Sequence, residues 1–176
     1  MGENNDRATQ YYNIGDWLST KLRYHKISSY SHIKNMQVNA GEVWYCNLGF
    51  NIGEEKNKMR PVLVISNNKI NRSGKVVVIC ITDAIGKLNQ NDLPSQDSWY
   101  LLYSDTMDDK KMYRAGRKIK FNQKANKFLD KDSVVQCEEI RSISKARLNR
   151  NKGCIGKIDN EDLKFIKMKL ERVFQI

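Results

Sequence analysis

The chain is poor in histidine and contains no long apolar run. It has only two histidines, His25 and His32, and it has no Walker A, GxGxxG or HExxH motif. A Ser-His-Asp or Cys-His catalytic site would therefore have to use a residue from the first forty positions. No stretch is apolar enough to span a bilayer or to form a signal-peptide core, so we expect neither a membrane protein nor a secreted one.

Cysteine is also sparse, and its spacing excludes two common kinds of site. The four cysteines include no CxxC pair, so they give neither a zinc signature nor a disulfide framework. Cys46, Cys80 and Cys137 lie inside apolar or alternating runs, which is typical of small buried side chains. This pattern is consistent with the reducing cytoplasm, and we expect no bound metal or other cofactor.

Acidic residues are missing from several blocks of the sequence. The chain has 31 Lys and Arg against 20 Asp and Glu, which gives a net charge of +11. Residues 110–128 and 141–157 carry positive charge only, and the first block also contains Tyr113, Phe121 and Phe128. Basic side chains beside aromatic rings favour single-stranded nucleic acid as a ligand. A solvated basic surface or an exposed hairpin without a ligand remains an alternative.

The pattern of apolar residues changes near Gly41, and it divides the chain into residues 1–40 and residues 41–176. In the first part we expect a short helix that starts at Asp16 and has Trp17, Leu22 and Tyr24 on its apolar face; the rest reads as loop. The second part has β-prone runs separated by turn signals, which predict a mainly antiparallel barrel or sandwich. These runs are residues 42–48, 60–68, 75–82, 98–103, 133–140 and 153–158.

Two helices are expected within this β-rich part. Ser144 is a plausible N-cap for a short helix. The C-terminal residues 158–176 form the most regular helical pattern, with Asp159 or Asn160 as the cap. One apolar stripe along this helix predicts core packing, and it consists of Leu163, Ile166, Leu170, Val173 and Phe174.

Arginine and hydroxyl chemistry is the remaining route to catalysis. Neighbouring carboxylates such as Glu138 and Glu139 point to opposite faces of a strand, so they do not readily share a metal ion. Arg60 opens one buried strand, and Thr82 ends the next. If these strands are neighbouring and antiparallel, both side chains lie at the same edge of the sheet. A solvated loop arginine and an ordinary strand-end threonine are the simpler readings of these two positions.

The order of these blocks resembles the MazF/PemK family of toxin ribonucleases. The resemblance rests on GEVWYCNLG, NIGEEKNKMRPVLVISNN, VVVICIT and DSVVQCEEIRSISKARL, and it runs from about Gly41 to the C-terminal helix. It implies a small SH3-like antiparallel barrel of the MazF/CcdB type with a C-terminal helix; residues 1–40 would be a helical extension. The family often has a serine at the position of Glu54, and the segment 104–131 is longer than usual.

The resemblance also implies a function, which is metal-independent and sequence-preferring cleavage of single-stranded RNA by a type II toxin. Arg60 and Thr82 match the catalytic arginine and threonine of the family, and Glu55 matches a supporting acidic residue. The expected products carry a 2′,3′-cyclic phosphate and a 5′-hydroxyl. The expected partners are messenger RNA, an acidic antitoxin and a second copy of the chain. The expected RNA-binding residues are Glu54, Lys56, Lys58, Arg114, Arg117, Lys118, Lys120 and Arg141.

Two other functions remain open at this stage. One is a non-enzymatic toxin on the same fold that inhibits DNA gyrase. The other is a nucleic-acid-binding module, for DNA or RNA, that has no activity of its own.

Overall fold

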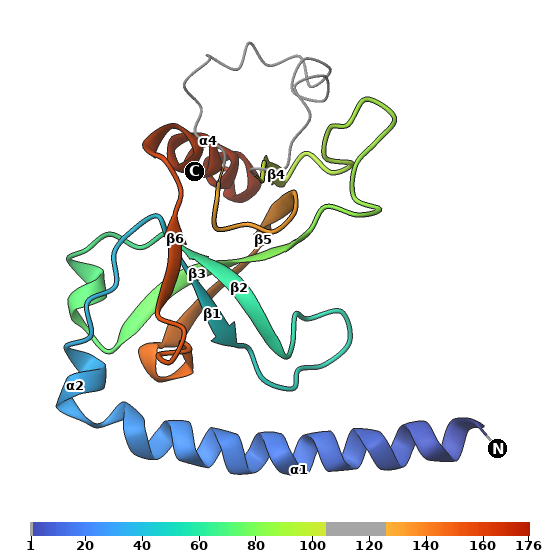
Figure 1. Ribbon diagram of the computed structural model, residues 1–176, viewed down its shortest axis with the longest axis vertical. Helices are drawn as coiled ribbons and strands as arrows, with labels where there is room; N and C mark the ends of the chain where they lie inside the picture. The colour runs from blue at the N-terminus through green and yellow to red at the C-terminus, as the bar shows by residue number, and fades with distance from the viewer. Residues whose placement is uncertain (1, 105–125) are drawn as a thin grey trace.

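The computed structural model describes residues 2–104 and 126–176, and its centre is one curled antiparallel sheet (Figure 1). In this part of the chain the strand order is β4-β5-β3-β2-β1-β6. The strands are β1 (Glu42–Asn47), β2 (Met59–Val64), β3 (Lys75–Asp83), β4 (Trp99–Leu102), β5 (Ser133–Ser144) and β6 (Cys154–Lys157). The predicted mainly β fold is therefore confirmed.

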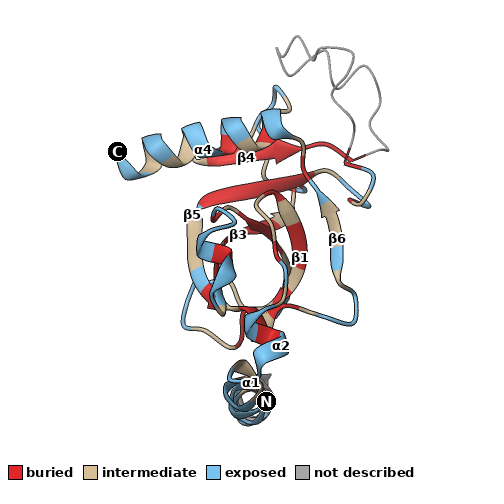
Figure 2. Ribbon diagram, turned by 90° about the vertical axis from the view of Figure 1, so that its left-hand side faces the viewer, coloured by how far each residue is buried: buried red, intermediate tan, exposed pale blue. Residues whose placement is uncertain are grey.

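Helices lie at both ends of the chain. The N-terminal helices are α1 (Gly2–Ser28) and α2 (Ser31–Lys34), and the C-terminal helix is α4 (Asn160–Phe174). Two short 3-10 helices are η1 (Ile70–Arg72) and η2 (Lys145–Arg147). Figure 2 shows the sheet curled into a ring, with α4 and β4 on one side and α1 seen end-on at the opposite side. No helix in residues 2–104 or 126–176 is long and apolar enough to cross a membrane.

The curled sheet buries two large groups of side chains, one on each face. Alternate residues of a strand point to opposite faces, so Val62 and Leu63 belong to different groups. The inner core lies inside the curl and includes Cys46, Val62 and Cys80. The outer core lies between the sheet and α4 and includes Leu63 and Ile166. Cys46, Cys80 and Cys137 are buried and unpaired, as predicted.

The C-terminal helix agrees with its prediction except at its last apolar residue. Asp159 is the N-cap, and its side chain accepts a 2.7 Å hydrogen bond from the backbone N–H of Asp162. Ile166 is fully buried in the outer core, and its neighbours on the stripe pack around it. Phe174 is 44% exposed, which corrects its assignment to the core. It lies in the last turn of the helix, next to the chain end.

The N-terminal helix differs more from its prediction. It is one continuous helix of 27 residues, so Asp16 lies in its interior and does not cap it. Trp17 and Tyr24 are half-buried as expected, whereas Leu22 is 63% exposed. A second helix, α2, forms where a loop was expected, and its Ile33 is fully buried. Burial of Ile33 explains why α2 forms despite its weak local signal.

Ser144 caps η2 as predicted, since its Oγ accepts a hydrogen bond from the backbone N–H of Ala146. The strand before it, β5, continues to Ser144 and is longer than expected. The pairing register of β5 with β3 shifts between Ile79 and Ile81. Such an irregularity bends a strand and helps a sheet to curl. The predicted division of the chain at residue 40 stays a prediction.

Candidate active site

The pairing of β2 with β3 determines where Arg60 and Thr82 lie. The two strands are antiparallel neighbours, and Val62 pairs with Cys80. If the register is carried two residues further, Arg60 lies across from Thr82. Both residues fall on the side of their strands that fills the inner core, because they alternate in step with Val62 and Cys80. Both residues therefore lie just beyond the same end of the β2–β3 ladder, at one rim of the curled sheet.

Arg60 is held at this rim by the strands around it. Its backbone pairs with Cys46 of β1, which fixes it on that side. Its Nε donates a 2.9 Å hydrogen bond to the carbonyl oxygen of Asn57. Arg60 and Thr82 are both half-buried, which leaves part of each side chain open to solvent. The terminal nitrogens of the guanidinium therefore keep donors for an anionic ligand.

The loop between β1 and β2, residues 48–58, carries the other predicted residues near the rim. Lys58 has a φ of 63°, and the loop closes where its N–H donates to the carbonyl oxygen of Gly49 at 2.7 Å. Inside the loop, Asn51 Nδ2 donates to the carbonyl oxygen of Lys56 at 2.6 Å. The loop is therefore folded by its own hydrogen bonds. Glu54, Glu55 and Lys58 are exposed, and Lys56 is half-buried.

Arg141 of β5 links this loop to the sheet. Its Nη2 lies 3.8 Å from Glu55 Oε2 and 3.8 Å from Glu139 Oε2. The side chain of Glu55 is 59% exposed, whereas that of Glu139 is only 20% exposed. Arg141 pairs with Val78 on β3, four residues before Thr82. The structure therefore pairs two predicted residues, Glu55 and Arg141, directly, and it adds Glu139 as a second partner of Arg141.

The Cys80 thiol of β3 senses the charges of several of these groups. Burial and, to a smaller extent, the charge of Glu139 raise its pKa to about 11. The positive charges of Arg141, Arg60 and Lys56 act on the same thiol and lower its pKa. The four charged side chains are thus close enough to one buried atom to interact with it. We conclude that they form one cluster around the end of β3.

Glu139 was missed because adjacent strand residues point in opposite directions. Its neighbour Glu138 faces the other way and accepts a 2.5 Å hydrogen bond from Trp99 Nε1. The pair Glu138-Glu139 gives no sequence signal that separates a structural carboxylate from one at the rim. Only the ion pair with Arg141 shows that Glu139 is the carboxylate at the rim.

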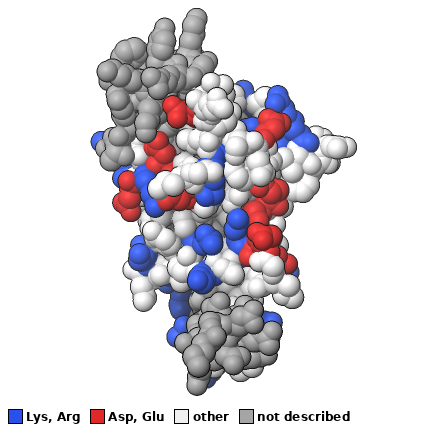
Figure 3. Space-filling model, turned by 90° about the vertical axis from the view of Figure 1, so that its right-hand side faces the viewer, with Lys and Arg blue, Asp and Glu red and all other residues white. Residues whose placement is uncertain are grey.

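Positive and negative charges are interspersed on this side of the molecule. Figure 3 faces the side toward which the β1–β2 loop projects, and it shows Lys and Arg with acidic side chains beside them. The predicted RNA-binding residues Arg114, Arg117, Lys118 and Lys120 lie outside the described residues. Where the chain is described, no three His, Cys, Asp or Glu side chains are grouped so that they could hold a metal ion.

The chain is similar to a known protein family and to several solved structures. The family model described as PemK-like, MazF-like toxin of type II toxin-antitoxin system matches residues 39–174. An endoribonuclease from a mycobacterial species, solved in complex with its cognate antitoxin, is similar in structure, with a TM-score of 0.51 and 17% identity. The alignment covers 80% of this chain and 97% of that one.

A second solved structure is that of MazF from Deinococcus radiodurans, with a TM-score of 0.53 and 16% identity. The alignment covers 79% of this chain and 97% of that one. At these identities the structural likeness establishes the fold and leaves the activity to be argued from the site.

Proposed function

Because this chain belongs to the PemK-like, MazF-like toxins of type II toxin-antitoxin systems, we propose that it is an endoribonuclease. It cuts single-stranded RNA at preferred short sequences and needs no divalent metal. The observation that carries this proposal is the antiparallel register of β2 with β3. That register supports a shared role for Arg60 and Thr82 at one scissile phosphodiester.

The reaction uses the RNA's own 2′-hydroxyl as the nucleophile. The 2′-oxygen bonds to phosphorus, the bond from phosphorus to the 5′-oxygen breaks, and the products are a 2′,3′-cyclic phosphate and a 5′-hydroxyl. Arg60 stabilises the charge that develops on the phosphoryl oxygens, since a planar guanidinium can donate to two oxygens at once. Thr82 Oγ donates one further hydrogen bond to the same phosphate.

Two protons must also move in this reaction. A base takes the proton of the 2′-hydroxyl, and an acid supplies one to the departing 5′-oxygen. Arg60 is a poor candidate for either transfer, because a guanidinium group does not readily give up a proton. Glu55 is the proposed base, and its ion pair with Arg141 supports a fixed position beside the rim. Arg141, Lys56 and Lys58 are proposed to bind neighbouring phosphates.

The remaining parts of the proposal concern partners. The net charge of +11 favours binding to RNA and to an acidic antitoxin. We further propose that the chain works as a homodimer in the cytoplasm. The other proposed RNA contacts are Glu54, Arg114, Arg117, Lys118 and Lys120.

The test is cleavage of a long single-stranded RNA by the purified protein, with and without EDTA. Arg60→Ala should lower the rate of cleavage about 10²- to 10³-fold, because a charge-stabilising donor is removed from the transition state. Thr82→Val should have a smaller effect. Arg72→Ala is the matched control, since Arg72 is an exposed arginine on η1. Mapping the fragment ends would identify the cyclic phosphate and the preferred sequence.

The outcomes separate the proposed activity from the other functions. Discrete fragments that are insensitive to EDTA and lost in Arg60→Ala support the nuclease. Intact RNA together with inhibited DNA gyrase would assign the chain to the non-enzymatic toxins. Retention of RNA without fragments, weakening steeply with salt, would reduce it to a binding module.

A further inference from the structure

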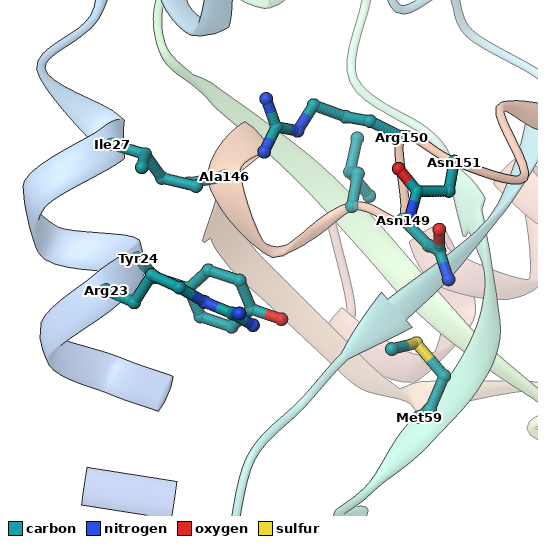
Figure 4. A pocket seen from close by; sticks show the side chains of 9 residues that line it. Arg23, Tyr24, Ile27, Met59, Ala146, Asn149, Arg150 and Asn151 are labelled. Carbon is teal, nitrogen blue, oxygen red and sulfur yellow. The ribbon is translucent and has the colours of Figure 1, made fainter. Parts of the chain in front are cut away.

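A cavity of about 300 Å³ lies between α1 and the strands, outside the cluster around Cys80. Arg23 and Tyr24 line it from α1, and Met59 lines it from β2. Asn149, Arg150 and Asn151 line it from the turn between η2 and β6. Figure 4 shows Tyr24 and Arg23 reaching from α1 toward the strands, and Arg150 reaching back toward α1. The cavity is at the small end of the range known for ligand pockets.

The lining of this cavity has the chemistry of a nucleotide site. Two guanidinium groups suit a phosphate, and two side-chain amides can both donate to and accept from the edge of a base. The Tyr24 ring lies 5.9 Å from the Arg23 guanidinium carbon, so together they offer an aromatic and cationic surface for stacking. None of the nine lining residues is acidic.

Asn149 Oδ1 accepts a 3.2 Å hydrogen bond from the backbone N–H of Lys152, and the Tyr24 ring packs edge-on against Trp17. Arg150 also has a partner, which does not block the cavity. Arg150 Nη1 lies 3.4 Å from His32 Nε2, and both residues are exposed. Arginine has five N–H donors, so this contact leaves others for a phosphate. An acidic peptide would use the two arginines equally well, but it would leave the aromatic ring and the two amides without a matched role. The lining therefore favours a nucleotide.

The position of the cavity connects it with the proposed cleavage site. Met59, which forms part of its wall, directly precedes Arg60 on β2, and the two side chains alternate to opposite faces of that strand. We propose that the cavity binds one nucleotide of the single-stranded RNA, next to the nucleotides that cross the Arg60–Thr82 rim. This inference rests on the proposed function and adds a sequence-reading site to it. The residues of α1 would then contribute to the choice of cleavage sequence.

The helix that supplies Tyr24 is fixed to the loop below the rim. The Trp17 ring packs so closely on Gly49 that a Cβ there would overlap it, and Gly49 has a φ of 94°. Arg147 lies over the same ring at 5.2 Å and donates a 3.1 Å hydrogen bond to the carbonyl oxygen of Leu48. These contacts hold α1 beside the loop of the proposed active site, so the cavity has a defined wall.

The test measures binding of a short fluorescein-labelled RNA of mixed sequence with 2′-fluoro sugars. This RNA lacks the 2′-hydroxyl nucleophile, so it reports binding whether or not the protein is a nuclease. Asn151→Asp keeps the shape of the side chain and adds a negative charge to the cavity. It should weaken binding at least about fivefold, whereas Asn91→Asp should change it less than about twofold. Asn91 is the control because it is an exposed asparagine that does not line the cavity.

Two further variants examine the phosphate and the base separately. Arg150→Ala should reduce the slope of log affinity against log salt by about 0.7, the value for one phosphate contact on a single strand. Tyr24→Leu should lower affinity at least about fivefold, since stacking of one base is lost. Lys21→Ala is the control for charge on α1, because Lys21 is exposed and does not line the cavity.

The results distinguish this inference from the proposed function. Weaker binding by the cavity variants supports the nucleotide site even if no cleavage is found. If Arg60-dependent cleavage occurs but Asn151→Asp and Arg150→Ala bind the RNA like the wild type, the cavity is not an RNA site. If the same variants lose binding of poly-glutamate but not of RNA, the cavity takes an acidic peptide and the inference is wrong.

Discussion

The two long terminal helices, α1 and α4, attach to the protein in different ways (Figure 1). On α4, Leu163, Ile166 and Leu170 repeat at helical spacing and all pack in the outer core. On α1, Leu18 and Leu22 lie one turn apart and both face solvent, with exposed fractions of 56% and 63%. Apolar residues at helical spacing are therefore buried in one helix and exposed in the other.

What holds α1 is a small number of specific contacts. The Trp17 ring lies on Gly49, and Arg147 lies over the ring. Two residues before Arg147, Lys145 donates to the carbonyl oxygen of Met36 in the segment that follows α2. The difference shows two ways to attach a helix. An apolar stripe that is buried along the helix stabilises it over its whole length, whereas a few specific contacts fix its position and bury little apolar surface.

The largest effect should come from the core side of α4. Ile166→Ala should lower the free energy of unfolding by about 3 kcal/mol, because Ile166 is fully buried and its removal leaves a cavity. Leu18→Ala on the exposed face of α1 should change it by less than about 0.5 kcal/mol. Urea unfolding followed by circular dichroism measures both. An equal loss in the two variants would contradict the contrast between the helices.

A second change tests the anchor of the N-terminal segment. Lys145 is fully buried, and its Nζ donates to the carbonyl oxygens of Lys34 at 3.0 Å and Met36 at 2.7 Å. Lys145→Met leaves both carbonyl groups without this donor and should cost about 2 kcal/mol of stability. Lys75→Met, at an exposed position, should have little effect. Thermal unfolding compares the two variants with the wild type.

The same lysine gives a pH dependence of stability. Burial lowers the pKa of Lys145 below its ordinary value, so the unfolded chain holds this proton more tightly than the folded one. Stability should therefore rise with pH between the lowered folded pKa and the unfolded value near 10.4. Lys145→Met should lack this contribution, which is read as the difference between the two stability profiles. Parallel profiles would show that the amine does not titrate differently on folding.

The smallest expected effect concerns one aspartate in each of the two helices. Asp159→Ala removes the N-cap of α4 and should cost about 1 kcal/mol. Asp16→Ala lies inside α1, where alanine is the better helix former, and should not destabilise the protein. Chemical unfolding resolves the difference. A loss at Asp16 as large as that at Asp159 would mean that this aspartate makes a contact beyond its helix.

The candidate site was predictable to the extent that it depends on strand order. The apolar runs around Val62 and Cys80 are joined by a turn, which suggested two neighbouring antiparallel strands. This pairing is confirmed. The same reasoning could not find Glu139, because its role depends on the direction of its side chain toward Arg141. The catalytic roles of Arg60 and Thr82 stay predictions that the cleavage assay tests.

The cavity beside α1 was also beyond sequence reasoning. Tyr24 and Arg150 are 126 positions apart in the sequence and belong to segments with weak local signals. Leu22 was expected on the apolar face of this helix with Trp17 and Tyr24, but it is exposed whereas the other two are half-buried. Helical spacing alone could not show which side of α1 would meet the sheet.

The sequence by itself determined the strands, the capped C-terminal helix and the excess of positive charge, because each depends on neighbours along the chain. The tertiary structure alone decided where α1 lies and which carboxylate pairs with Arg141. Those outcomes depend on contacts such as that of Arg147 with Leu48, which are 99 residues apart. Local propensity carries no information about such contacts, since they form only when the curled sheet brings distant segments together.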